Sequence, residues 1–201
     1  MSPKRKSPKT VLAQDAVMRS LIKIHEPPVI GRSPVFISLV RGIISQQISE
    51  AAASSIYKRL KALSDITPAA LLELSPETIR SCGISNPKVG YIQSIAQSVL
   101  AGELDKIETM PDEEAIKKLV QLKGVGRWTA EMILIFALGR DNVWACDDAG
   151  LRRAARRLYG CSESVEDFKA LGERFVPYRS HAPGISGVLW IRKHDSFRTE
   201  Y

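Results

Sequence analysis

Apolar residues along most of the chain recur every three or four positions, which is the spacing of one face of an α-helix. The pattern predicts helices in five ranges spread through the sequence: Val11–Ile24, Phe36–Ile44, Ala51–Leu63, Lys88–Val99 and Thr129–Leu138. No stretch alternates apolar and polar residues between turn signals in the manner of a strand. We therefore expect an all-α protein of roughly ten helices and no sheet.

Capping residues followed by proline indicate where several helices begin. The combination occurs four times, at Ser33-Pro34, Thr67-Pro68, Ser75-Pro76 and Asn86-Pro87. The capping side chain can accept an unpaired amide of the first turn, and proline fits there because that position needs no N–H. By contrast, Met1–Lys9 is basic and lacks core-forming residues, so we expect a disordered tail before a folded region at 10–201.

Composition narrows the class of protein. The 201 residues carry a net charge of +7 and a pI near 9.4, which favours an acidic partner, nucleic acid first. Three widely spaced cysteines, Cys82, Cys146 and Cys161, argue against a disulfide framework and indicate a reducing compartment. The chain shows neither a signal peptide nor an apolar run long enough to cross a bilayer, so we expect a soluble intracellular protein.

A glycine turn, Gly124-Val125-Gly126, separates two helical patterns. Glycine permits a positive φ and leaves no side chain between the backbone and a ligand. Amides at the start of the following helix would then face outward and could bind an anion such as a DNA phosphate. Lys123 and Arg127 flank the turn and add positive charge. The alternative is a plain corner in which glycine only ends the first helix.

Two adjacent aspartates, Asp147 and Asp148, precede another helical pattern. Either could cap that helix, which is the ordinary role of an aspartate in such a place. A carboxylate at a helix N-terminus is also favoured in its ionised form. The two roles are therefore compatible, and an ionised carboxylate is available for chemistry.

Both motifs resemble those of a known family. The hairpin Leu122–Ala130 and the segment Val143–Asp148 resemble the helix-hairpin-helix DNA glycosylases, most of all the 3-methyladenine DNA glycosylase II branch that repairs alkylated bases. The resemblance runs from about Ser33 to about Arg192. It implies two helical lobes with a substrate cleft between them. One lobe would comprise 10–35 and about 145–201, and the other about 36–144, including the hairpin at 120–130.

The resemblance also implies a reaction. Asp148 takes the place of the catalytic carboxylate, and Asp147 becomes the capping or supporting residue. The carboxylate would stabilise the oxocarbenium character of the sugar and orient the attacking water. Bifunctional relatives carry a lysine two positions after Gly126, where this chain has Trp128. We therefore expect a monofunctional glycosylase that leaves an abasic site in an unbroken strand.

Residues for substrate and DNA follow by motif position. An aromatic face suits a cationic alkylated base, and the implied pocket consists of Trp128, Met132 and Tyr178. The residue that fills the gap left by the flipped base is Gln47, or Ile48 in second place. The implied contacts with duplex DNA are therefore Gln47, Ile48, Lys123, Gly124, Val125, Gly126, Arg127 and Thr129. Lys88 and Tyr91, on one helix face, are interpreted as a surface lysine beside a core tyrosine.

The expected ligands are few. In the family the hairpin carbonyls can hold a monovalent cation, here those of Val120, Leu122 and Val125; no other cofactor and no iron–sulfur cluster is expected. The partner is double-stranded DNA with a damaged base, bound by a monomer. Two alternatives stay open: a non-catalytic helix-hairpin-helix DNA-binding module, and a glycosylase for another damaged or mismatched base. Ala182-Pro183-Gly184 should delay the last helix to about Ile185–Arg192.

Overall fold

The computed structural model describes residues 6–24, 30 and 33–182, and these form eleven α-helices, one 3₁₀ turn and no strand. The prediction of an all-α fold is confirmed. The helix expected at Ile185–Arg192 lies outside the described residues. The chain divides into two compact units, one with residues 6–24, 30 and 139–182 and the other with residues 33–138.

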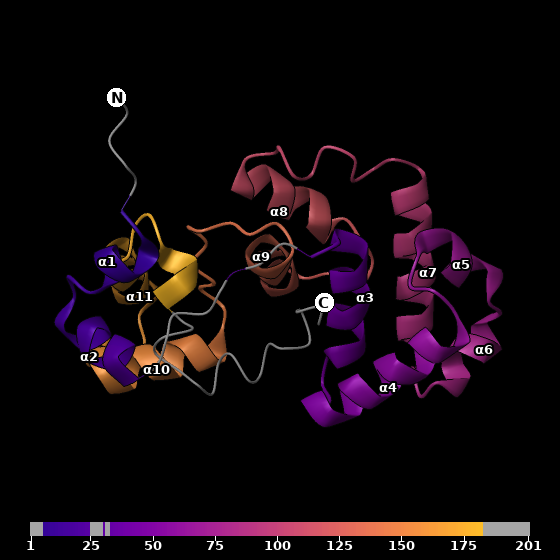
Figure 1. Ribbon diagram of the computed structural model, residues 1–201, viewed down its shortest axis with the longest axis horizontal. Coiled ribbons are helices and arrows are strands. Elements are labelled where there is room, and N and C mark those ends of the chain that lie inside the picture. The colour runs from indigo at the N-terminus through magenta and orange to yellow at the C-terminus, as the bar shows by residue number, and fades with distance from the viewer. Residues whose placement is uncertain (1–5, 25–29, 31–32, 183–201) are drawn as a thin grey trace. The chain divides into compact units, whose positions relative to one another are not determined.

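The first unit is built from helices of both the N-terminal and the C-terminal part of the described chain. It contains α1 (Pro8–Leu12), α2 (Ala16–Ile24), α10 (Ala149–Tyr159), α11 (Val165–Glu173) and the 3₁₀ turn Arg179–His181 (Figure 1). Trp144 lies at its centre, with its ring centroid 5.0 Å from that of Phe168 and its indole N–H donating to the Phe168 carbonyl at 3.1 Å. Buried aromatic groups thus hold the loop before α10 against α11.

The prediction of a single helix at Val11–Ile24 is wrong, because the helix is interrupted between α1 and α2. A carboxylate oxygen of Asp15 accepts the amide of Met18 at 2.9 Å and so caps α2. Asp15 also accepts the Tyr159 hydroxyl at 2.9 Å and pairs with Arg174. The first helix begins at Pro8, inside the expected tail, with the hydroxyl of Ser7 as its cap.

The second unit carries the remaining helices: α3 (Val35–Ser45), α4 (Glu50–Leu63), α5 (Pro68–Glu73), α6 (Pro76–Ser81), α7 (Asn86–Leu100), α8 (Asp112–Val120) and α9 (Arg127–Phe136). Helix α3 packs against α4, α7 and α9 (Figure 1). Three of its apolar side chains, Leu39, Val40 and Ile43, are fully buried. This helix therefore forms the core on which α7 and the hairpin between α8 and α9 rest.

Two of the four predicted caps are confirmed. The Thr67 hydroxyl accepts the amide of Ala70 at 3.2 Å, and the Ser75 hydroxyl accepts that of Thr78 at 3.1 Å. The other two are wrong. Helix α3 begins at Val35, and Asn86 is the first residue of α7.

Ser33 has a tertiary role instead of capping α3. Its hydroxyl donates to the Phe136 carbonyl at 3.1 Å and lies 2.8 Å from the Ser38 hydroxyl, so it joins the start of α3 to the end of α9.

The boundary between the units falls between Leu138 and Gly139, before the expected position near 145. Ser180 explains this placement. Its hydroxyl donates to the Arg140 carbonyl at 2.6 Å and accepts the Val143 amide at 2.9 Å, while its own amide donates to the Asp141 carbonyl at 2.9 Å. These bonds hold 140–143 within the first unit.

Candidate functional site

The two glycines of the hairpin between α8 and α9 differ in backbone conformation, and only Gly124 has the positive φ that glycine permits. Gly124 has a φ of +82°, and a Cβ on it would lie 2.4 Å from Cδ2 of Tyr91. Gly126 precedes α9 with a φ of −89°, and a Cβ there would meet no atom within 4 Å. The N-cap residue of α9 is Gly126, which has no side chain to cap the helix. One glycine thus lets the turn pack on α7, and the other places no side chain over the start of a helix, a position that favours an anion.

The charge around the hairpin differs from the prediction at Arg127. Its guanidinium donates to Glu113 at 2.7 and 3.2 Å and to Glu131 at 3.1 Å. The bond to Glu113 raises the pKa of Arg127 and lowers the pKa of Glu113. Two carboxylates therefore offset this charge, so Arg127 is a weaker candidate for a DNA phosphate than the sequence indicated. Lys123 is exposed beside the turn.

Gln47 and Ile48 form an exposed turn between α3 and α4. Gln47 has a φ of +60°, the only positive φ of a non-glycine residue in the part of the chain that the structure describes. Ile48 is 40% exposed. The Ser49 hydroxyl accepts the Ala52 amide at 3.3 Å and so starts α4 immediately after the turn. The turn thus presents two side chains to solvent on a strained backbone.

Lys88 is not the surface lysine that the sequence indicated. Its ammonium group donates to the carbonyl oxygens of Ile44 at 2.9 Å and Gln46 at 2.7 Å, and burial lowers its pKa. The Gln46 side-chain amide in turn donates to the Gly124 carbonyl at 2.9 Å. Sequence reasoning missed this connection because its partners lie 42 to 78 positions apart in the chain.

The residues predicted to line the base pocket are mostly buried. Met132 is fully buried, and Thr129, predicted to contact DNA, is 4% exposed. Tyr178 is also 4% exposed, and its hydroxyl donates to the Lys6 carbonyl. These are the contacts of core residues in their own units. Trp128 is partly exposed on the first turn of α9 and remains the candidate for an aromatic wall.

Asp148 is the cap of α10. Its Oδ1 accepts the amide of Leu151 at 2.7 Å, and the residue is only 4% exposed. Of the two roles that the resemblance offered for Asp147, capping is therefore wrong, because Asp148 occupies the cap position. Asp147 is exposed. The positive end of the α10 dipole lies at Asp148, and the cap fixes the direction of one of its oxygens.

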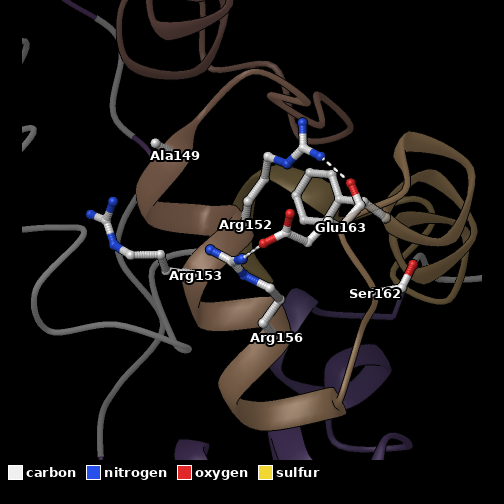
Figure 2. A pocket seen from close by; sticks show the side chains of 7 residues that line it. Ala149, Arg152, Arg153, Arg156, Ser162 and Glu163 are labelled. Carbon is white, nitrogen blue, oxygen red and sulfur yellow. Dashed lines mark hydrogen bonds and ion pairs between the residues drawn. The ribbon is translucent and has the colours of Figure 1, made fainter.

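An arginine-rich face follows Asp148 along α10, and the sequence analysis did not single it out. Arg152, Arg153 and Arg156 line a hollow of about 310 Å³ (Figure 2). Arg152 donates to the Glu163 backbone carbonyl at 2.6 Å, and Arg156 pairs with the Glu163 carboxylate. Arg153 points away from Glu163 (Figure 2). This helix adds positive charge beside the candidate carboxylate, which favours a polyanionic partner.

Few groups here suit a metal ion. Within 6–24, 30 and 33–182, no cluster of three or more His, Cys, Asp or Glu side chains could hold one, and the three cysteines form no disulfide. A monovalent cation needs only neutral oxygens. Val120 ends α8, so its carbonyl lies at the helix terminus, and the Leu122 carbonyl accepts the Val125 amide across the turn.

In the same described ranges, no helix has the length and apolar character to span a membrane.

Comparison with known proteins matches residues 40–177 to the family described as HhH-GPD superfamily base excision DNA repair protein. The chain is 38% identical over 161 residues to DNA-3-methyladenine glycosylase 1 of Schizosaccharomyces pombe, covering 76% of this chain and 69% of that protein. It is 34% identical to the crystal structure of a DNA-3-methyladenine glycosidase from Bacillus halodurans, with a TM-score of 0.77 and coverage of 92% and 89%. A Schizosaccharomyces pombe 3-methyladenine DNA glycosylase in complex with abasic DNA gives 30% identity, a TM-score of 0.79 and coverage of 92% and 96%.

Proposed function

The chain belongs to the HhH-GPD superfamily of base excision DNA repair proteins, and we propose that it is a monofunctional glycosylase of the 3-methyladenine DNA glycosylase II type. It would hydrolyse the N-glycosidic bond of alkylated bases such as 3-methyladenine and 7-methylguanine, leaving an abasic site. The observation that carries the proposal is the buried Asp148 at the start of α10, in a chain that also carries the hairpin.

The proposed mechanism assigns two roles to Asp148. As the base leaves, positive charge develops on the sugar, and the ionised carboxylate stabilises it. The same group orients the water that attacks the sugar. One carboxylate oxygen is held by the Leu151 amide, so the carboxylate has a fixed direction before the substrate arrives. A nucleotide base methylated at N3 of adenine or N7 of guanine is already cationic and a good leaving group, so the reaction needs little acid catalysis.

The absence of strand cleavage is part of the proposal. A lyase step requires an amine that forms a Schiff base with the sugar. Trp128 stands at the position where bifunctional relatives carry lysine, on the first turn of α9 and partly exposed. It would form an aromatic wall for the flipped base.

Binding of duplex DNA is assigned to the second unit. The N-terminus of α9 and Lys123 would contact the phosphate backbone, and the Gln47 turn would fill the space of the extruded base. The carbonyls of Val120, Leu122 and Val125 would supply neutral oxygens to a monovalent cation that bridges to a phosphate.

Base release from methylated duplex DNA tests the function, with wild type compared against Asp148→Asn. Asparagine caps a helix about as well as aspartate, so only about 0.3–1 kcal/mol of charge–dipole stabilisation should be lost. Base release should fall by at least about a hundredfold, the low end for a residue that acts directly in the reaction. Wild-type strands should stay intact until alkali is added.

Each alternative function has its own outcome in this assay. Strand breaks without alkali would contradict the monofunctional assignment. Salt-sensitive duplex binding with no base released would favour a DNA-binding module or another damaged base.

A further inference from the structure

The turn between α3 and α4 holds a conformation that it would not adopt alone. Gln47 has a φ of +60°, a region that side chains other than glycine, asparagine and aspartate seldom occupy. Such a residue persists only where neighbouring groups fix the backbone around it. The contacts that fix this turn therefore decide where the exposed Gln47 side chain points.

Lys88 supplies the first of these contacts. Helix α3 ends at Ser45, so the carbonyls at its end lack partners within the helix. The Lys88 ammonium donates to two of them, Ile44 at 2.9 Å and Gln46 at 2.7 Å. These two carbonyls flank Ser45, and the second belongs to the residue immediately before Gln47. Charged donors make the stronger hydrogen bonds, so one side chain holds the end of α3 and the start of the turn together.

Gln46 and Tyr91 join the same turn to the hairpin. The Gln46 side-chain amide donates to the Gly124 carbonyl at 2.9 Å. On the other side, the Tyr91 ring lies so close to Gly124 that an added Cβ would come within 2.4 Å of it. Lys88 and Tyr91 are three residues apart on α7, so one helix contacts both the Gln47 turn and the hairpin. All of these residues belong to one unit.

We propose that Lys88 and Gln46 are positioning residues that fix the Gln47 turn to the hairpin, so that backbone binding and insertion into the duplex occur as one rigid movement. This inference rests on the proposed function. When the hairpin binds a phosphate, the turn is already at a set distance from it. The free energy of backbone binding can then be used to open the base stack, because the inserting residue does not have to be ordered first.

Loss of the Lys88 contacts should affect two substrates differently. A base paired in the stack must be extruded, whereas a base opposite an abasic site costs less to extrude. Loss of the Lys88 contacts should therefore slow release of a paired base and have little effect on an unpaired one. A merely structural role would reduce both rates equally.

The experiment uses duplexes with a single 7-methylguanine, placed opposite cytosine or opposite an abasic site. The variants are Lys88→Met, which keeps most of the side-chain length but removes the donors, Gln46→Ala, which removes the bond to the hairpin, and Lys88→Arg, which keeps donors. Lys106→Met is the matched control, since Lys106 is an exposed lysine of the same unit. Single-turnover rates, duplex affinity and melting temperature are measured for each.

We expect Lys88→Met to slow release opposite cytosine by about tenfold, equivalent to the loss of one charged hydrogen bond. Opposite the abasic site the change should stay within about twofold, because little extrusion is needed there. Gln46→Ala should show the same selectivity, Lys88→Arg should recover part of the rate, and Lys106→Met should match wild type. Equal losses on both duplexes, or no loss on either, would overturn the proposal.

A second readout is independent of the chemistry. 2-Aminopurine beside the target nucleotide becomes brighter when the stack opens. Wild type should brighten it, and Lys88→Met should do so less at equal occupancy of the DNA. If wild type releases no base, the proposed function fails, but this readout still decides the present inference. Unchanged brightening in Lys88→Met, or none with wild type, would overturn it.

Discussion

Substituting each hairpin glycine with alanine should separate folding from DNA binding. At Gly124 the backbone has a φ of +82°, and the new Cβ would lie 2.4 Å from Cδ2 of Tyr91. At Gly126 the φ is −89°, and a Cβ would meet nothing within 4 Å. The two positions are two residues apart, yet only one of them requires glycine for the fold.

The magnitudes follow from these two geometries. A left-handed conformation costs alanine about 1–2 kcal/mol. Forcing the Tyr91 ring away adds an overpacking cost of about 1–3 kcal/mol. Gly124→Ala should therefore destabilise the protein by about 2–5 kcal/mol, or roughly 4–20 °C in melting temperature for a chain of this size. Gly126→Ala changes only the residue that precedes α9, at a cost of about 1 kcal/mol or less.

Thermal unfolding followed by circular dichroism, together with fluorescence anisotropy of a labelled duplex, measures both effects. Gly124→Ala should melt early. Gly126→Ala should melt within a few degrees of wild type but bind DNA more weakly, because its methyl group stands where the α9 amides would meet a phosphate. An unchanged melting temperature for Gly124→Ala would refute the packing argument. Wild-type affinity in Gly126→Ala would refute the anion site at the start of α9.

Three further predictions concern charge, packing and thiol reactivity. Lys123→Gln should weaken duplex binding for every sequence and reduce the slope of log affinity against log salt by about 0.9; an unchanged slope would mean that Lys123 contacts no phosphate. Gly172→Ala should destabilise the protein by about 1 kcal/mol in denaturant titration, because a Cβ would lie 2.8 Å from Nε1 of Trp144 and this overpacking outweighs the gain in helix propensity. Its control, Gly90→Ala, has open space at the Cβ and should stabilise the protein by about 0.5–1 kcal/mol; stabilisation by both variants would contradict the close contact. Burial raises the pKa of the Cys82 thiol, so iodoacetamide at pH 8 should label it more slowly than Cys146 or Cys161, as peptide mass spectrometry would show, and similar rates for all three would contradict the burial.

Local features of the sequence were enough to predict the helical fold and several helix starts. Thr67 and Ser75 cap their helices as expected, because a hydroxyl three positions before an amide acts within one turn. The sequence also predicted the hairpin from a local feature, because glycine readily adopts the φ of +82° that the turn has at position 124. The hairpin and the aspartate, taken together, also indicated the family to which the chain belongs.

Where a side chain could bind several partners, only the tertiary structure determined which of them it binds. The sequence could not tell that Asp148 rather than Asp147 caps α10, because either lies within reach of the first amides. It placed Lys88 on the surface, whereas the carbonyls that Lys88 binds come from another helix more than forty positions earlier. Asp15 divides a continuous apolar pattern because it also meets Tyr159 and Arg174. Periodicity and caps report interactions within one turn of the chain, and these three outcomes depend on groups that only folding brings together.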